Sequence, residues 1–273
     1  MKQIVVFLLY FCVVGSVYSK TEKVMVRGAV GNLSAIIETP EVQVGKRCPA
    51  VILMHGFGDN KNSPLLVLIA QKLDSLGIAS IRFDFDAHGE SEGAFQQMTV
   101  PREVEDGLDV YEYVKNLNRF GTIALLGHSQ GGVVASMVAG RLGSKKIGDV
   151  VLLAPAAVLR DDAIRGNTMG SVYDPLNPPE FVQLPNGLKL GREYILTAFR
   201  LPIYETAAKY HGPACIIHGT ADRIVPYTYG ERYHEIWKKS SFFLLEGFDH
   251  GFWQNMNRAA DIAVADLSKK ILH

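Results

Sequence analysis

The sequence predicts an α/β domain in which a mostly parallel, eight-stranded sheet is flanked by helices on both faces. The first observation is a series of apolar, β-branched runs bounded by turn residues, which are typical of buried strands. The second is that segments with helical periodicity lie between these runs. The third is the composition, since 273 residues with 48% hydrophobic and 21% charged side chains suit one globular domain with a large core. Apolar strands that alternate with helices indicate a parallel sheet covered on both sides.

Eight apolar runs are expected to form the strands of this sheet. The first two carry the weakest pattern and are expected to pair as an antiparallel edge. In chain order, the expected strands are Lys23–Arg27, Leu33–Glu38, Ala50–Met54, Ala79–Phe85, Ile123–Leu126, Val150–Leu153, Cys215–Ile217 and Phe242–Leu245.

Four segments have the apolar spacing of helices that pack on a sheet. In the first, Ser63 is a candidate N-cap and Gly77 a stop signal. The expected helices are Pro64–Leu76, Glu103–Leu117, Val133–Leu142 and Arg258–Leu272.

The segment Ala157–Gly212 breaks this alternation of strands and helices. It holds Pro, Asn and Gly turns, scattered aromatic residues and only short periodic pieces. A crossover between two strands needs far fewer residues. We therefore expect a cap inserted over the active-site edge of the sheet.

The N-terminus predicts a secretory signal peptide, residues 1–19. Lys2 gives a short positive start, and the apolar run Ile4–Gly15 is too short to span a bilayer comfortably. Val17 and Ser19 lie three and one residues before a plausible cleavage point. The mature chain, residues 20–273, is then an exported protein, secreted or periplasmic, without stable membrane association. The alternative is an uncleaved membrane anchor.

The charge balance argues against a nucleic-acid partner. The 28 basic and 28 acidic residues give a formal net charge of zero, without the basic surplus typical of nucleic-acid binding. No convincing metal-ligand cluster is found, and no cofactor is expected.

Cys48 and Cys215 begin strands about three places, or roughly 14 Å, apart in the expected sheet. A disulfide needs Cα atoms within about 7 Å, so two buried free thiols are expected. The oligomeric state stays open.

A Gly-x-Ser-x-Gly pattern occurs twice, and only one copy has the context of a nucleophile. Ser129, in Gly127-His128-Ser129-Gln130-Gly131, directly follows an expected strand and enters a helix through small residues. The start of that helix would stabilise a developing oxyanion. Ser91, in Gly89-Glu90-Ser91-Glu92-Gly93, follows its strand only after a polar stretch and leads into no helix. Ser129 is therefore the predicted nucleophile and Ser91 a loop residue.

A serine nucleophile needs a histidine base and a carboxylate that orients it, in the chain order Ser, acid, His for the α/β-hydrolase fold. His250 lies in a loop just after the last expected strand and is the predicted base. Asp222 follows the preceding strand and is the predicted acid, with Glu246 as the alternative. His218, at a strand end, is a candidate core histidine, and His234 an exposed helical one.

Two backbone amides are expected to form the oxyanion hole. One belongs to Gln130, the residue after the nucleophile. The other is that of Phe57 in the stretch His55-Gly56-Phe57-Gly58, which follows the third expected strand. The neighbouring glycines would let the backbone approach a substrate closely.

With these residues placed, the chain from about Ala50 to the C-terminus resembles the bacterial cinnamoyl and feruloyl esterases of the α/β-hydrolase superfamily. The segments that carry the resemblance are His55-Gly56-Phe57, Phe83-Asp84-Phe85, His88-Gly89-Glu90-Ser91, Met98-Thr99-Val100, the stretch from Gly127 to Ser136, Leu152-Leu153-Ala154-Pro155-Ala156, Gly166-Asn167-Thr168, Leu201-Pro202-Ile203-Tyr204-Glu205 and Ile217-His218-Gly219-Thr220.

The resemblance implies hydrolysis of hydroxycinnamate esters such as ferulate, caffeate and p-coumarate, which decorate plant cell-wall polysaccharides. It also implies that the cap offers Asp162 and Tyr194 to the phenolic hydroxyl. Met169 stands where some relatives have Gln, which leaves the details of phenol recognition open. From the residues alone, Asp162 could equally be a solvated turn residue and Tyr194 a core aromatic.

Other functions remain to be weighed against this one. An acetyl or short-chain acyl esterase would use the same three residues. A serine peptidase would too, but usually carries a propeller or a larger partner domain, for which this chain has no room. A non-catalytic binding protein on the same fold is the third alternative.

Overall fold

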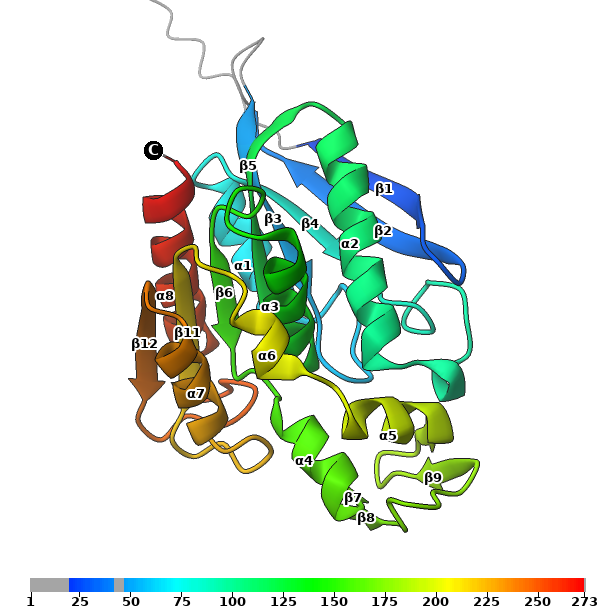
Figure 1. Ribbon diagram of the computed structural model, residues 1–273. Coiled ribbons are helices and arrows are strands. Elements are labelled where there is room, and N and C mark those ends of the chain that lie inside the picture. The colour runs from blue at the N-terminus through cyan, green and yellow to red at the C-terminus, as the bar shows by residue number, and fades with distance from the viewer. Residues whose placement is uncertain (1–19, 42–46, 273) are drawn as a thin grey trace, which may run out of the picture.

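A central eight-stranded sheet organises the computed structural model, which describes residues 20–41 and 47–272 (Figure 1). The strand order is β1-β2-β4-β3-β5-β6-β11-β12. The pairs β1–β2 and β2–β4 are antiparallel and all others are parallel, which confirms the predicted antiparallel edge. The strands are β1 (Lys20–Arg27), β2 (Asn32–Thr39), β3 (Cys48–Met54), β4 (Ala79–Phe83), β5 (Phe120–His128), β6 (Val150–Leu153), β11 (Ala214–Gly219) and β12 (Ser240–Leu245).

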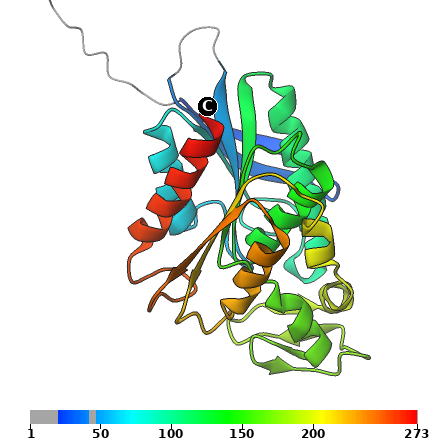
Figure 2. The same ribbon diagram turned by 60° about the vertical axis from the view of Figure 1, so that its left-hand side comes forward.

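Helices cover both faces of the sheet, as the alternation of apolar runs predicts. Figure 2 shows α1 (Pro64–Asp74) and α8 (Met256–Ile271) on one side, and α2 (Val100–Asn116), α3 (Gln130–Leu142) and α7 (Thr228–Ile236) on the other. Alternate residues of a strand serve the two cores. In β3, Val51 and Leu53 face α1 and α8, while Ile52 and Met54 face the opposite helices. The continuous apolar runs of the sequence reflect this two-sided burial.

Three of the four predicted helices begin earlier than expected. Helix α1 begins at Pro64 as predicted, with Ser63 at its N-cap position, although the Ser63 side chain makes no capping hydrogen bond. Helices α3 and α8 begin at Gln130 and Met256 rather than at Val133 and Arg258. Helix α2 begins at Val100, because Thr99 Oγ1 accepts the N–H of Arg102 and Pro101 is tolerated in a first turn.

The two cysteines of the described chain are free and buried. Cys48 lies in β3 and Cys215 in β11, and these strands are three places apart in the sheet. The expectation of two free thiols is confirmed.

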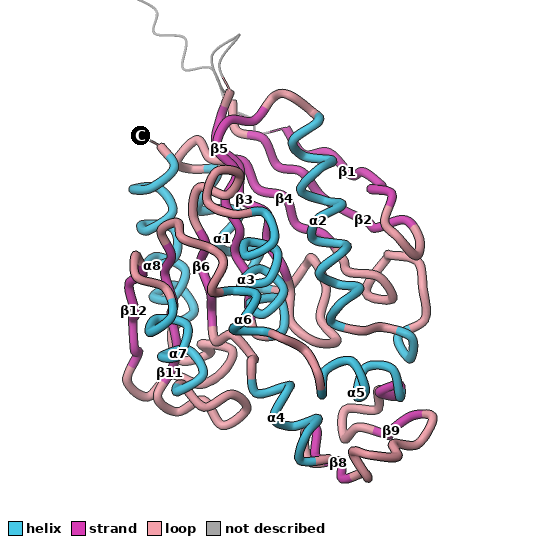
Figure 3. The backbone as a smooth tube through the Cα atoms, viewed as in Figure 1, coloured by secondary structure: helices cyan, strands magenta, loops and turns pink. Residues whose placement is uncertain are grey.

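The segment between β6 and β11 lies partly beyond the carboxyl ends of the parallel strands (Figure 3). There α4 (Val158–Arg165) and α5 (Arg192–Phe199) flank two short hairpins. The last helix of the segment, α6 (Ile203–Ala207), instead packs against α3 in the body of the domain. The hairpins are β7 (Asn167–Thr168) with β8 (Ser171–Val172), and β9 (Phe181–Gln183) with β10 (Lys189–Gly191).

Among the helices of residues 20–41 and 47–272, none combines the length and apolarity needed to cross a bilayer. The predicted signal peptide, residues 1–19, lies outside the described residues.

Asp149 is a fully buried carboxylic acid at the start of β6. Burial raises the pKa of its carboxyl group, and the neighbouring Asp266 carboxyl on α8 raises it further. Asp149 is therefore protonated in the folded protein over a range of pH in which it is ionised in the unfolded chain.

We expect Asp149→Asn to stabilise the protein relative to wild type at alkaline pH. An unfolded aspartate titrates near pH 4, so the wild-type protonated pair contributes stability below about pH 4 that is lost as the pH rises through the raised pKa. The asparagine cannot ionise. The unfolding free energy of Asp149→Asn minus that of the wild type should therefore increase by about 1 kcal/mol or more between pH 5 and pH 9. Urea unfolding at both pH values measures it. Asp261→Asn is the control, because Asp261 lies on α8 as Asp266 does and forms a partly exposed pair with Lys72 on α1. An equal difference at both pH values would contradict this account.

Candidate active site

Ser129 occupies a strained turn between β5 and α3. Its backbone angles are φ 56° and ψ −123°, in a region that L-residues rarely adopt. The turn is so tight that a Cβ atom on Gly127 would lie 2.1 Å from the carbonyl oxygen of Gly131. A Cβ atom on Gly131 would in turn lie 2.3 Å from the carbonyl oxygen of His55. Both glycines of the motif are therefore required, and the serine hydroxyl is held at the end of the strand.

Three side chains that are distant in the sequence form a hydrogen-bonded row at this turn. The Nδ1–H of His250 donates to Asp222 Oδ2 over 2.7 Å, because a carboxylate only accepts. Nε2 of His250 is then the free acceptor for the hydroxyl of Ser129, 2.8 Å away. The structure thus brings together the three residues predicted to act as nucleophile, base and acid. Glu246, the alternative acid, is exposed.

Asp222 is held by four donors at the end of β11. Its Oδ1 accepts the backbone N–H groups of Ile224 and Val225 at 2.9 and 2.8 Å. Its Oδ2 lies 3.2 Å from Nε2 of His218 as well as close to His250. Burial alone would raise the pKa of Asp222, but the hydrogen bonds from the two histidines hold it well below its usual range. His218 is the buried histidine that the sequence predicts, and its contact with the acid was missed.

His128 restrains the loop that carries His250. Its Nε2 lies 2.9 Å from the carbonyl oxygen of His250, and the two rings are 5.1 Å apart. Burial, and to a smaller extent the neighbouring His250, lower the pKa of His128 to about 4. A neutral imidazole with Nε2–H donating to that carbonyl satisfies both observations. Sequence analysis did not predict this contact of His128.

The loop after β3 passes directly against the nucleophile. A Cβ atom on Gly56 would lie 3.1 Å from Cβ of Ser129, so a side chain at position 56 would crowd the nucleophile. His55 holds the loop: its Nδ1 lies 2.8 Å from the carbonyl oxygen of Gly56, and its Nε2 accepts the N–H of Phe85 over 3.2 Å. Burial lowers the pKa of His55 to about 4, which keeps the ring neutral for this pairing. The His-Gly pair at the strand end therefore has a structural reason.

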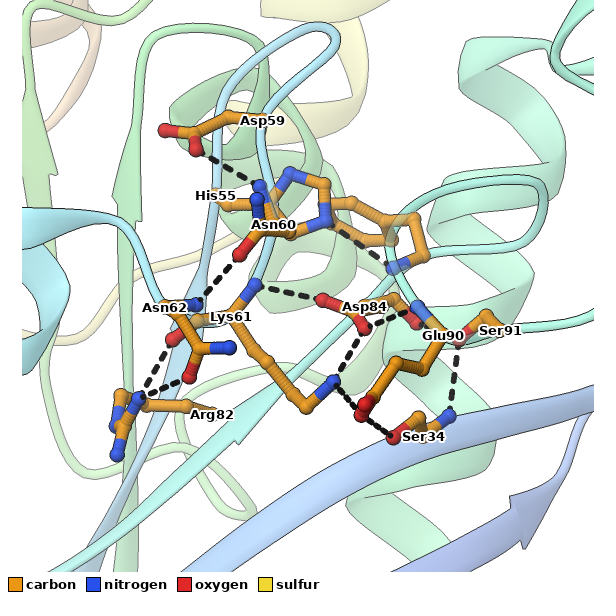
Figure 4. Close-up of polar contacts among 11 residues, drawn as sticks. Ser34, His55, Asp59, Asn60, Lys61, Asn62, Arg82, Asp84, Glu90 and Ser91 are labelled. Atoms are coloured by element: carbon orange, nitrogen blue, oxygen red, sulfur yellow. Dashed lines mark hydrogen bonds and ion pairs between the residues drawn. The ribbon is translucent and has the colours of Figure 1, made fainter.

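A buried ion pair supports the far end of the same loop (Figure 4). Both the backbone N–H and Nζ of Lys61 lie 2.6 Å from the carboxylate of Asp84, and the two residues are 2% and 0% exposed. Asp84 also accepts the N–H of Glu90 over 2.8 Å. Ser91 Oγ donates to the carbonyl oxygen of Asp84 and accepts the N–H of Ser34. The second Gly-x-Ser-x-Gly copy thus lies in a loop, as predicted, and it braces this ion pair.

A cavity of about 800 Å³ opens above Ser129 and His250. Phe57 and Gln130 line it, with Gln130 in the first turn of α3, where backbone N–H groups have no partner within the helix. The inserted segment supplies the opposite wall, which includes Leu159, Asp162, Arg165, Asn167, Thr168, Met169 and Tyr194.

Asp162 and Tyr194 both reach this cavity, in different environments. Asp162 is partly buried, which raises the pKa of its carboxyl group, and it pairs with Arg165 over 2.9 Å. Tyr194 is 3% exposed, and its hydroxyl donates to Gln130 Oε1 over 2.7 Å. Met169 lies at the tip of the β7–β8 hairpin with φ 52°. Sequence reasoning missed Arg165, Asn167 and Thr168 as wall residues, although the segment containing the last two was noted.

Within residues 20–41 and 47–272, no cluster of three or more His, Cys, Asp or Glu side chains is arranged to hold a metal ion.

Comparisons with known proteins support a serine hydrolase. A family described as Hydrolase_4, serine aminopeptidase S33, matches residues 45–175. The structure of Est1E from Butyrivibrio proteoclasticus with ferulic acid bound is similar, with a TM-score of 0.87 and 26% identity over 92% of this chain and 100% of that one. A dienelactone hydrolase from Anabaena variabilis shares the fold, with a TM-score of 0.67 and 13% identity over 93% and 99% of the two chains. The predicted α/β-hydrolase fold is confirmed.

Curated relatives match at lower coverage. Human Protein ABHD12B is 27% identical over 191 residues, which are 69% of this chain and 49% of that protein. Lysophosphatidylserine lipase ABHD12 from Danio rerio is 23% identical over 194 residues, or 69% of this chain and 47% of that protein. The chain therefore spans about half the length of the curated relatives it matches.

The strain at Ser129 predicts a difference between two variants that both lack the hydroxyl. Ser129→Gly relieves the unfavourable backbone angles, whereas Ser129→Ala keeps them. We expect the glycine variant to be the more stable by about 1 kcal/mol, although glycine usually costs stability through its unfolded-state entropy. Urea unfolding of the two variants measures the difference. An alanine variant that is more stable by the usual cost of a glycine, about 0.5–1 kcal/mol, would show that the turn carries no strain.

Proposed function

We propose that this α/β-hydrolase is a serine carboxylesterase that releases hydroxycinnamic acids such as ferulate, p-coumarate and caffeate from their esters. The observation that carries the proposal is the similarity, along almost the whole chain, to an enzyme structure with ferulic acid bound. The cavity above Ser129 supports it, because apolar wall residues such as Leu159 and Met169 suit an aromatic ring, and the polar residues beside them suit a phenolic end.

In the proposed reaction, Ser129 Oγ attacks the ester carbonyl carbon while His250 Nε2 takes the hydroxyl proton. Asp222 stabilises the imidazolium that forms. The negative oxygen of the tetrahedral intermediate accepts hydrogen bonds from the backbone N–H groups of Phe57 and Gln130. His250 then protonates the departing alcohol. Water attacks the acyl-enzyme with His250 as base and releases the acid and the free serine. No metal or organic cofactor takes part in this scheme.

Asp162 is the proposed partner of the phenolic hydroxyl. Its carboxylate accepts a hydrogen bond, and the ion pair with Arg165 fixes its orientation at the cavity wall. Tyr194 is the proposed second polar group of the same wall. The chemistry suits a phenol, which is a hydrogen-bond donor, at the end of an aromatic acyl group.

The proposed natural substrates are hydroxycinnamates ester-linked to plant cell-wall polysaccharide. These esters lie outside the cell. The N-terminal sequence, with its predicted signal peptide, agrees with an exported enzyme.

A lipase-type activity is the second candidate, because curated relatives include a lysophosphatidylserine lipase. Such an enzyme would prefer a long aliphatic acyl chain to an aromatic one. A short-chain acyl esterase would prefer acetate to either.

A panel of methyl ferulate, methyl p-coumarate, 4-nitrophenyl acetate, 4-nitrophenyl palmitate and lysophosphatidylserine separates these functions. We expect kcat/KM for the methyl hydroxycinnamates to exceed that for the lipid-like substrates by at least about tenfold. Ser129→Ala should lose at least about a thousandfold in kcat and should fail to react with a fluorophosphonate probe that labels the wild type. Turnover of the lipids alone would exclude the feruloyl assignment, and an unlabelled wild type would exclude a serine hydrolase.

Replacement of the cap carboxylate should affect only phenolic substrates. We expect Asp162→Asn to raise KM for methyl ferulate about tenfold and to leave methyl cinnamate, which has no phenol, nearly unchanged. Arg165→Met, which keeps the carboxylate but removes its partner, is the control for the ion pair. Equal losses on both esters would argue against phenol recognition by Asp162.

A further inference from the structure

A second row of buried polar side chains connects the cavity wall to the nucleophile turn. The hydroxyl of Tyr194 on α5 donates to Gln130 Oε1 over 2.7 Å. Nε2 of Gln130 donates to Glu103 Oε2 over 2.8 Å. Tyr194, Gln130 and Glu103 are 3%, 2% and 1% exposed. We call these residues the Glu103–Gln130–Tyr194 row.

The row uses both ends of the Gln130 side-chain amide. A glutamine amide has one acceptor oxygen and one donor nitrogen, and here each has a fixed partner on a different helix. Glu103 lies in the first turn of α2, and Tyr194 lies in the inserted segment. The Phe57 ring packs edge-on against Tyr194, with ring centroids 5.9 Å apart. The two residues with the proposed oxyanion amides therefore both contact Tyr194.

Glu103 lies in an environment that disfavours its ionised form. Burial raises the pKa of its carboxyl group well above the usual range, and Asp86 and Asp106 raise it further against the opposing effect of Gln130. A protonated carboxylic acid has nearly the shape of a glutamine amide. The contact with Gln130 needs a hydrogen-bond acceptor at Glu103, which the carboxyl group supplies in either protonation state.

We propose that Glu103 is a positioning residue for ester hydrolysis, which acts through Gln130 to hold the oxyanion amides and the Tyr194 wall in register. The inference rests on the proposed hydrolase function, but not on the identity of the acyl group. Gln130 directly follows the strained Ser129, so its side chain anchors the first turn of α3, where the proposed amide donor lies. Without an acceptor at Glu103, the buried Nε2–H of Gln130 has to find another partner, and the first turn shifts with it.

The test compares Glu103→Met, Glu103→Gln and Glu105→Met on 4-nitrophenyl acetate. Methionine matches glutamate in length and suits a buried site, but accepts only a weak hydrogen bond. We expect it to lower kcat about tenfold, with little change in KM, because a small displacement of oxyanion donors affects mainly the transition state. Glutamine keeps the acceptor and should stay within about twofold of wild type. Glu105→Met is the matched control, since Glu105 is on the same helix and pairs with Arg141 at the surface.

Tyr194→Phe tests the other end of the row in a variant that keeps the packing of the ring. The acetyl group has no phenol, so a loss of kcat on 4-nitrophenyl acetate would come through Gln130 and would support the proposal. Melting curves for all variants show whether activity changes without loss of folding. Unchanged kcat in both Glu103→Met and Tyr194→Phe would overturn the proposal, as would a glutamine variant that is as impaired as the methionine one.

The acetate assay tests the role of Glu103 independently of which acyl group the natural substrate carries. Wild-type protein that turns over the acetate but not methyl ferulate would remove the feruloyl assignment, while the comparison of kcat among the variants still decides the role of Glu103.

Discussion

The tight turn at Ser129 is the constraint on which the arrangement of the site depends. A serine with φ 56° persists only where the surroundings enforce it, and two glycines and the backbone of β3 do so here. The same geometry points the hydroxyl away from the sheet and exposes the first amides of α3. Nucleophile and oxyanion donor are therefore set by one backbone conformation, and neither can be moved without the other.

Neutral histidines, rather than charged ones, stabilise the loops around this turn. His55 and His128 are both buried, and burial lowers the pKa of each to about 4. Each ring then pairs one nitrogen with a backbone group of a neighbouring loop. The charged groups, by contrast, are paired: Lys61 with Asp84 beneath the loop after β3, and Asp222 with the histidine it orients. The loops against the nucleophile are thus held by neutral rings, and the buried charges near them are compensated by partners.

The sequence predicts the sheet and the three residues of the hydrogen-bonded row at Ser129 because their signals are local. The strand Val150–Leu153 was predicted to the residue, since four apolar residues are bounded by turns. The strand from Ala79 ends at Phe83 rather than Phe85, because Asp84 turns inward to bind Lys61, 23 residues earlier. Such a partnership has no signature in the sequence. Glu103 was assigned only to an amphipathic helix for the same reason, because its contact with Gln130 depends on how α2 and α3 pack.

The hydrogen bonds along the Glu103–Gln130–Tyr194 row determine which substrate groups can pair with Tyr194 at the cavity wall. A tyrosine hydroxyl has one proton, and in Tyr194 that proton is committed to Gln130 Oε1. Its oxygen can still accept, so a substrate group beside it has to be a donor. Burial raises the pKa of Tyr194 well above its ordinary value, which keeps the proton in place. The carboxylate of Asp162 also accepts. Under the proposed function, Tyr194 and Asp162 both favour a hydrogen-bond donor such as a neutral phenol over a phenolate or a carboxylate. Glu103 contributes to this preference through Gln130, although it does not line the cavity.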